Sequence, residues 1–243
     1  ALAAVLHADL CQIYTDVDGV YTADPRIVPN ARKMEEVTYD EMLEMASLGA
    51  KVLHSRCVEI AKKYGVELLV CSSLNRNSGT MVREKTKMEK MLISGVAADK
   101  NVAKIRVAGL GNDPESTFRL LNLLDRNNLN IDVMIQSLGK DGTKSVSFTV
   151  AKPDMLRTID VLNDNKDLLG IKKLDYDENV AKVSVIGAGV RSHSGVAAKM
   201  FGALANAGIN TEMVTTSEIR ITALIDEAYA DQAMRAIHET FLE

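Results

Sequence analysis

IYTDVDGVYTADPRIVP, residues 13–29, decides how the first part of this sequence folds. The pattern predicts a buried strand that ends at carboxylates, followed by a loop that contains Gly19 and the pair Pro25–Arg26. Ligands collect at the carboxyl ends of strands in α/β proteins, and this loop offers an aromatic ring, carboxylate acceptors and a guanidinium. An Asp- and Gly-rich surface turn has the same composition, so the residue types alone leave both interpretations open.

The residues after this loop predict two helices and a further strand. Thr38 and Glu41 form a capping-box pattern, and Met42 and Met45 fall on one helical face. A second helix is expected from about residue 50 to 64, ended by Gly65 and followed by the apolar strand VELLVC. The polar segment 72–80 and the charged run after it predict a domain boundary, so we expect an α/β portion over residues 1–82.

The rest of the sequence contains an internal repeat. NVAK occurs at residues 101–104 and again at 179–182, and LNID at 129–132 matches INTE at 209–212. Each copy predicts the order strand, helix, strand, strand, helix, which is typical of ferredoxin-like α+β folds. We expect one such domain at 83–165 and another at 166–243. An apolar strand at 91–99 precedes the first copy and can pack with the second.

Composition argues against several classes of function. The formal charge of −4 and the absence of a basic run argue against a nucleic-acid partner. No apolar stretch approaches the roughly 20 residues that span a bilayer, so no membrane role is expected. Three cysteines without CxxC spacing indicate neither disulfides nor a zinc site and favour the cytoplasm. No histidine has metal-ligand spacing, so we expect no protein-held metal.

Two segments together resemble a known family. YTDVDGVYTADPR at 14–26 and DEMLEMASLGAKVL at 40–53 closely resemble aspartate kinases, members of the amino-acid kinase superfamily. The resemblance implies transfer of a phosphoryl group from ATP, with Mg²⁺, to L-aspartate. It implies that the following residues line the ATP site: Thr15, Asp16, Tyr21, Thr22, Ala23, Asp24, Pro25 and Arg26.

Lys51 is the candidate for a catalytic contact to the phosphates. The resemblance places it there, and it also follows Gly49 at the start of a predicted helix, where backbone N–H groups and a lysine together favour a phosphate. A solvated surface lysine is the alternative from position alone.

The repeated segments resemble the ACT domains of the same family, which bind amino acids. The resemblance implies lysine, threonine or both as effectors in aspartate biosynthesis. The implied contacts are Asn130, Ile131, Asp132 and Gln136 in the first copy and Val196, Ala197, Asn210, Thr211, Ser217 and Glu218 in the second. The second copy has Ser194–Gly195 where its helix begins, whereas the first has Pro114–Glu115, and a glutamate there opposes a docking carboxylate.

Three functions fit this combination. The sequence can be the C-terminal part of an aspartate kinase, a non-catalytic regulatory subunit, or a separate ACT-type sensor of amino acids. The segment 14–26 favours the first, because a sensor has no use for a nucleotide loop. The family's N-terminal loop, which carries a catalytic lysine, has no counterpart in residues 1–243. Pairing through ACT domains predicts a homodimer or a larger homo-oligomer.

Overall fold

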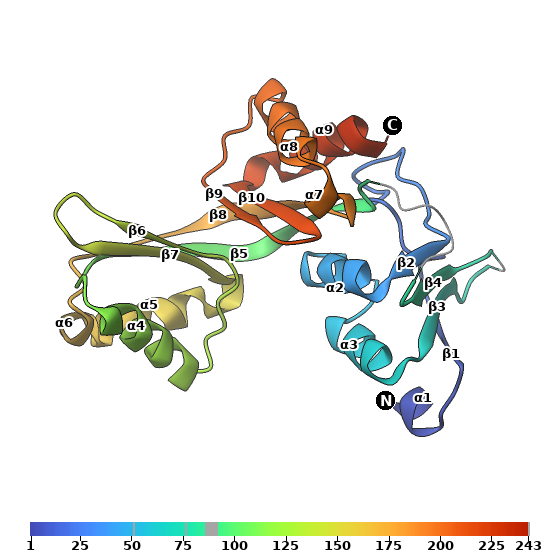
Figure 1. The fold of residues 1–243 in the computed structure, drawn as a ribbon, viewed down its shortest axis with the longest axis horizontal. Helices are drawn as coiled ribbons and strands as arrows, with labels where there is room; N and C mark the ends of the chain where they lie inside the picture. The colour runs from blue at the N-terminus through green and yellow to red at the C-terminus, as the bar shows by residue number, and fades with distance from the viewer. Residues whose placement is uncertain (51, 76, 86–91, 243) are drawn as a thin grey trace. The chain divides into compact units, whose positions relative to one another are not determined.

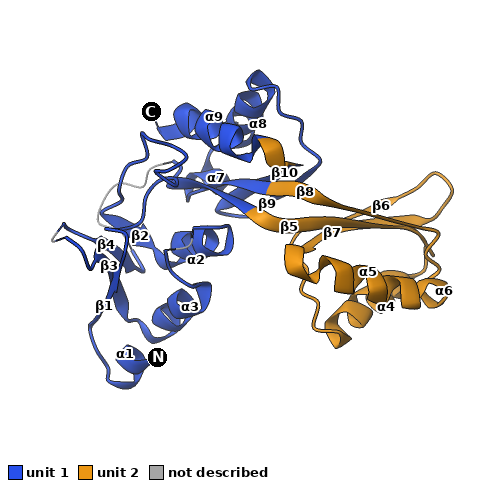
Figure 2. Ribbon diagram, turned by 180° about the vertical axis from the view of Figure 1, so that it is seen from behind, with its two compact units in different colours: residues 1–99, 182–225, 229–243 blue, residues 100–181, 226–228 orange. Residues whose placement is uncertain are grey.

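The computed structural model describes residues 1–50, 52–75, 77–85 and 92–242. The chain divides into two compact units (Figure 2). Unit 1 contains residues 1–99, 182–225 and 229–243, and unit 2 contains residues 100–181 and 226–228. Among the described residues, no helix is both long and apolar enough to cross a membrane.

The first part of unit 1 is a four-stranded sheet with helices packed against it. Its strand order is β1-β3-β4-β2, in which β1 and β3 are parallel, β2 and β4 are parallel, and β3 and β4 are antiparallel. The strands are β1 Leu10–Thr15, β2 Glu36–Thr38, β3 Glu67–Ser72 and β4 Thr80–Arg83, and the helices are α1 Leu2–Val5, α2 Tyr39–Ser47 and α3 Ser55–Tyr64. Met42, Val58 and Val70 are fully buried between sheet and helices. This is the α/β portion that the sequence predicted.

Local signals set the ends of these helices. The Thr38 side chain accepts a hydrogen bond from the Glu41 backbone N–H, and Glu41 bonds back to Thr38, so the predicted capping box is present. Gly65 ends α3 with φ 66°, also as predicted. The start of α3 is different: the helix begins at Ser55 and not near residue 50, because His54 Nδ1 accepts from the Arg56 N–H and caps it there.

The second part of unit 1 is an α+β layer. Residues 95–99 of β5 (Gly95–Leu110), the end of β8 (Lys173–Ile186), β10 (Arg220–Asp226) and β9 (Met213–Thr216) lie in the order β5-β8-β10-β9. The short α7 Gly189–Ser192 precedes two longer helices, α8 Gly195–Asn206 and α9 Ala230–Leu242. Figure 1 shows α8 and α9 together on one face of these strands. Ile93 and Val96 share the core of this layer with Met200 and Ile237.

Unit 2 has the same plan. Its strands lie in the order β6-β7-β5-β8, with the helices on one face of the sheet (Figure 1). The elements are β6 Met134–Leu138, β7 Lys144–Ala151, α4 Pro114–Arg126, α5 Met155–Asp164 and α6 Lys166–Leu169, together with single 3₁₀ turns at Lys152–Asp154 and Glu227–Tyr229. Ile105, Leu120, Phe148 and Leu162 are at most 1% exposed and form its core. Both units therefore contain a ferredoxin-like arrangement, as the repeat predicted.

One expected break in the sequence is missing. The apolar strand near residue 95 and the strand KIRVAGL at 104–110 were expected to be separate, but they form one continuous 16-residue strand, β5. The intervening residues carry no Gly or Pro that would turn the chain, so it remains extended.

Candidate functional site

A closed loop follows β1 and carries most of the predicted nucleotide residues. The loop, residues 16–35, doubles back on itself through a β-bridge between Tyr21 and Lys33. The Thr22 N–H donates to the Arg32 carbonyl at 2.9 Å, and the Met34 N–H donates to the Val20 carbonyl at 2.9 Å. These bonds make a narrow neck, and residues 23–31 form the tip.

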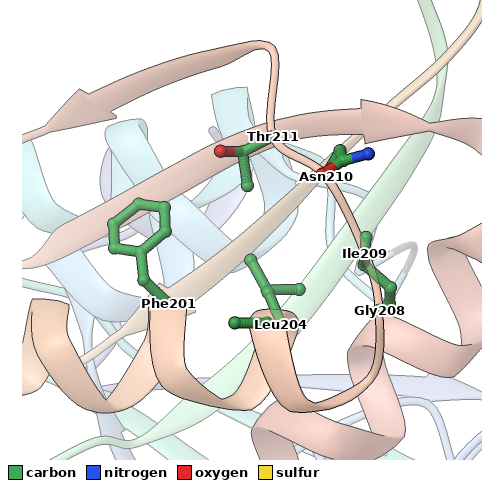
Figure 3. Close-up of a pocket in the computed structure, with 7 residues that line it drawn as sticks. Phe201, Leu204, Gly208, Ile209, Asn210 and Thr211 are labelled. Carbon is green, nitrogen blue, oxygen red and sulfur yellow. The ribbon is translucent and has the colours of Figure 1, made fainter.

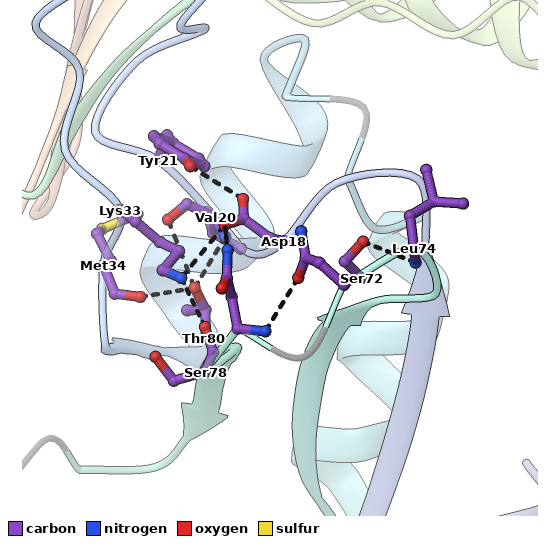
Figure 4. Close-up of polar contacts among 11 residues, drawn as sticks. Asp18, Val20, Tyr21, Lys33, Met34, Ser72, Leu74, Ser78 and Thr80 are labelled. Carbon is purple, nitrogen blue, oxygen red and sulfur yellow. Dashed lines mark hydrogen bonds and ion pairs between the residues drawn. The ribbon is translucent and has the colours of Figure 1, made fainter.

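The Thr80 hydroxyl holds the base of this loop. It accepts from the Val20 N–H at 2.8 Å and donates to the Met34 carbonyl at 2.6 Å, so it bonds to both sides of the neck (Figure 4). Thr80 is completely buried. Gly19 is required beside it: φ is +152° there, and an added Cβ would lie 2.6 Å from the Thr80 hydroxyl oxygen.

Asp18 gathers three donors at the mouth of the loop. Its carboxylate accepts from the Tyr21 hydroxyl at 2.9 Å, from Lys33 Nζ at 3.3 Å and from Asn77 Nδ2 at 3.4 Å. Desolvation alone would raise the pKa of Asp18, but these hydrogen bonds outweigh it and hold that pKa below its ordinary value. The hydrogen bond to Asp18 in turn raises the pKa of Tyr21. Asp18 is therefore a carboxylate at neutral pH.

The tip of the loop presents a positive charge to solvent. Arg26 donates to Asp24 through its backbone N–H at 2.9 Å and through its guanidinium at 2.6 Å. These hydrogen bonds hold the pKa of the Asp24 carboxyl below its ordinary value. The Arg26 side chain nevertheless remains 86% exposed, so its guanidinium is accessible to an anionic ligand.

The other predicted nucleotide residues differ in where their side chains lie. The Thr15 hydroxyl donates to Asp16 at 3.0 Å where β1 ends, and Asp16 and Pro25 are exposed. Thr22 and Ala23 are buried, so their side chains face the protein and not solvent. Lys51 lies outside the described residues.

Sequence reasoning missed the residues that fix the loop. Asp18 lies inside the quoted stretch, but nothing in its position distinguished it from Asp16. Lys33 contacts Asp18 from 15 residues away in the chain. Thr80 contacts Val20 from 60 residues away. The periodicity of residue types along a sequence carries no information about contacts between such distant residues. No sequence signal could therefore have identified Lys33 and Thr80 as partners of the loop.

A cavity lies at the C-terminal end of α8 in unit 1. Its volume is about 410 Å³, and Phe201, Leu204, Ile209, Asn210 and Thr211 are among its lining residues. Figure 3 shows Phe201 and Leu204 on α8 facing the segment that carries Asn210 and Thr211. Two of the predicted effector contacts therefore line the same cavity, whose other lining residues are mostly apolar.

The remaining predicted effector contacts of unit 1 lie at the opposite end of α8. Val196 is 1% exposed, so only its backbone can face a ligand, and Ala197 is partly buried. Glu218, next to Ser217 in the β9–β10 turn, forms an ion pair with Arg191 at 3.1 Å. In the described structure no side chain caps the start of α8, and its first turn holds no acidic residue. These four residues do not join Asn210 and Thr211 in one site.

In unit 2, the start of α4 is capped by the carboxylate of Asp113. Asp113 caps α4 by accepting from the Glu115 N–H at 3.0 Å and also contacts the Ser116 hydroxyl and Arg119. Asn130 and Asp132 are exposed, and Ile131 is partly packed on the core. Gln136 accepts from the Thr117 hydroxyl at 2.6 Å, which ties β6 to α4. The two ferredoxin-like layers thus differ electrostatically where their first helices begin.

The described residues contain no group of three or more His, Cys, Asp or Glu side chains arranged to hold a metal ion.

Two protein families match parts of the chain. Residues 1–72 match the amino acid kinase family, and residues 183–241 match the ACT domain family. The first match covers β1 and the loop that follows it, and the second covers the layer that contains α8 and α9.

Whole-chain relatives agree with both matches. An aspartokinase of Pseudomonas aeruginosa is 45% identical over 99% of this chain, which spans 59% of that relative's length. Among solved structures, Escherichia coli aspartokinase III in complex with aspartate and ADP matches all of this chain with a TM-score of 0.88 at 28% identity. The chain covers 54% of that enzyme, and the same enzyme with lysine and aspartate, in its T-state, gives a TM-score of 0.80.

A shorter solved chain matches part of this chain. It comes from a crystal structure of aspartokinase alpha and beta subunits and is 42% identical, with a TM-score of 0.58. The match covers 61% of this chain and 98% of the other.

Proposed function

Because this chain belongs to the aspartate kinase family, we propose that it forms the nucleotide-loop and regulatory part of an enzyme that phosphorylates L-aspartate. The γ-phosphoryl group of ATP would pass to the side-chain carboxylate, giving 4-phospho-L-aspartate. The chain spans 59% of the length of its relative, so the reaction belongs to the whole protein. The observation that carries the proposal is the closed loop 16–35 after β1, which holds the exposed Arg26 guanidinium beside the Asp24 carboxylate.

The loop residues fit a nucleotide by their chemistry. Phosphoryl transfer depends chiefly on positioning and on neutralising the phosphate charge, to which bound Mg²⁺ contributes. In this proposal the Arg26 guanidinium and Lys51 face the phosphates, while Thr15, Asp16 and the backbone of residues 21–25 face the rest of the nucleotide. Asp18 and Thr80 contribute by keeping the neck closed.

Steady-state kinetics of the whole enzyme test the catalytic part of the proposal. We expect Lys51→Met to lower kcat/KM for ATP by about 100-fold or more, because a phosphate-neutralising charge is lost. Lys62→Met is the matched control: Lys62 lies on α3 and pairs with Asp40 at 2.5 Å, away from the loop. Equal kinetics for the two variants would remove Lys51 from the site.

A non-catalytic regulatory subunit is the second candidate. The match of 61% of this chain to nearly all of a shorter aspartokinase chain favours it. Residues 1–72, which match the amino acid kinase family, favour the enzyme instead. An aspartate-dependent ATPase assay of the whole protein separates the two, because a regulatory subunit alone would show no turnover.

We further propose that unit 2 is a second ACT domain and that the enzyme is a cytoplasmic homo-oligomer. We also propose that lysine or threonine binds to the ACT domains. The uncapped start of α8 suits the carboxylate of an amino acid, since backbone N–H groups and the helix dipole favour an anion there. Asn210 and Thr211, at the other end of α8, would then serve a second molecule or a partner subunit. Asp113 already satisfies the start of α4. The second copy of the repeat is therefore the better candidate for binding.

Calorimetric titration of this chain with lysine and with threonine tests that assignment. We expect Glu218→Gln to weaken binding and Glu115→Gln, at the start of α4, to leave it unchanged. Light scattering on the same samples reports the oligomeric state. A monomer with no affinity for either amino acid would contradict the regulatory part of the proposal.

A further inference from the structure

Thr22 directs its hydroxyl into the protein, toward His238 of α9. Its side chain is 4% exposed and accepts from the Arg32 N–H at 3.0 Å. The same oxygen lies 2.9 Å from Nε2 of His238, which is completely buried in α9. A residue of the nucleotide loop is thus hydrogen-bonded to the last helix of the ACT layer, all within unit 1.

A second contact lies one helical turn further along α9. The Arg32 guanidinium donates to the Leu242 backbone carbonyl. Thr22 and Arg32 face each other across the neck and are joined by two hydrogen bonds, from the Thr22 N–H and from the Arg32 N–H. A single turn of α9, from His238 to Leu242, therefore holds both sides of the neck.

Apolar packing and a strand contact reinforce this attachment. Ala23 and Val28 of the loop belong to the same core as Met234 and Ile237 of α9. The Thr22 carbonyl accepts from the Val96 N–H at 2.7 Å, at the start of β5. The neck is consequently built as part of the ACT layer, and a movement of α9 carries Thr22 with it.

We propose that His238 is a positioning residue for nucleotide binding: through Thr22 it sets the geometry of the loop that carries Asp24 and Arg26. Asp24 is two residues beyond Thr22, so a shift at the neck changes where the Arg26 guanidinium lies. Effector binding at α8 can reach the loop by the same route, since α8 packs against α9. The inference rests on the proposed function, because it takes the loop to be the nucleotide site.

Amide hydrogen exchange without any ligand tests the attachment itself. We expect the Thr22 and Arg32 amides to exchange about tenfold faster in His238→Leu, the change expected for losing a buried hydrogen bond. His238→Gln keeps a polar group near the position of Nε2 and should restore most of the protection. Amides of β3, in the same unit, serve as the internal reference for global stability.

Ser184→Ala is the matched control. The hydroxyl oxygens of Ser184 and Thr222 lie 2.7 Å apart, and both residues are buried in the same ACT layer. Their hydrogen bond does not involve the loop. The control should lose global stability without selective exchange at the neck. Equal exchange at Thr22 in the Leu and Ala variants would overturn the attachment.

Kinetics of the whole enzyme then test the functional role. In His238→Leu, KM for ATP should rise severalfold while kcat and KM for aspartate stay close to wild type, and inhibition by the effector should weaken. His238→Gln should recover KM. An unchanged KM for ATP despite faster exchange at the neck would overturn the positioning role. An inactive wild-type enzyme would instead refute the proposed function, and the exchange data would still decide the attachment.

Discussion

The loop 16–35 depends on single side chains that bond to its backbone. Thr80 holds the base of the neck and Thr22 holds its far end, each through a buried hydroxyl. Asp18 adds a charged acceptor at the mouth. These contacts replace regular secondary structure in a stretch that forms no helix and only an isolated β-bridge.

Thr80→Val should lower the free energy of unfolding by about 1–3 kcal/mol, because the buried Val20 N–H and Met34 carbonyl lose their partner. Thr80→Ser keeps the hydroxyl and should cost less. Denaturant unfolding of both variants measures the difference. A larger loss in Thr80→Ser than in Thr80→Val would mean that the methyl group, and not the hydroxyl, holds the neck.

The Asp18–Tyr21 pair predicts how the loop responds to pH. The folded-state pKa of Asp18 is lowered, so its contribution to stability is present above the ordinary Asp value near 4 and is lost as pH falls through the lowered value. The pKa of Tyr21 is raised, so its contribution is present below about 10 and is lost as pH rises through the raised value. The mouth of the loop should thus stay closed between these limits.

Asp18→Asn should return the pKa of Tyr21 toward its ordinary value, because the anionic acceptor is removed. NMR titration of the tyrosine ring carbons checks this, with Tyr21→Phe to assign the signal. A Tyr21 titration that is unchanged in the variant would contradict the pairing.

The sequence indicated which residues form the loop but not how their side chains are used. Asp24 and Arg26 form a local pair two residues apart, so such a contact is within reach of sequence reasoning. Thr22 was expected to line the ligand site, and its burial against His238 depends on a residue 216 positions away. His238 was set aside as a histidine without metal-ligand spacing.

Two helix ends were predicted correctly because their caps are local, although the start of α3 was placed about five residues too early. The Thr38 capping box and the Gly65 end of α3 are both present. Strand lengths were predicted less well. The full length of β5 depends on β7 and β8, its neighbours in the sheet, which no local pattern contains.

Gly65, which follows α3, and Gly202, inside α8, should respond in opposite directions to substitution by alanine. Gly65→Ala should destabilise the protein by about 1 kcal/mol, because a Cβ is strained at φ +66°, although no described residue beyond its chain neighbours lies within 4 Å of the added Cβ. Gly202 lies inside α8 with open space around it, so Gly202→Ala should stabilise by about 0.5–1 kcal/mol. Thermal unfolding of both variants provides the measurement. A loss of stability from Gly202→Ala would mean that another group packs closely against α8 at this position.

Each of the two units has its own hydrophobic core. Leu120 is completely buried in the core of unit 2, and Leu204 is 1% exposed in the core around α8 and α9 of unit 1. The repeat predicted two similar layers, but not that unit 1 would contain both the α/β sheet and one of the layers. That grouping follows from packing between segments far apart in the chain.

Leu120→Ala should cost about 2–5 kcal/mol and should speed amide exchange in β7 more than in β3. Leu204→Ala makes the same change in the other core. It should speed amide exchange in β10 more than in β7. Uniform changes across the chain in both variants would mean that the units unfold together.

The placement of β5 has a consequence for the order in which the protein forms during synthesis. Unit 2 is almost complete once residue 181 has been made, whereas the ACT layer of unit 1 needs residues 182–242 to join β5. The loop 16–35 is translated before unit 2, but its neck gains its partners in α9 only when His238 and Leu242 emerge. A nascent chain stalled before residue 238 would carry all residues of unit 2 and a loop whose neck still lacks its partners in α9.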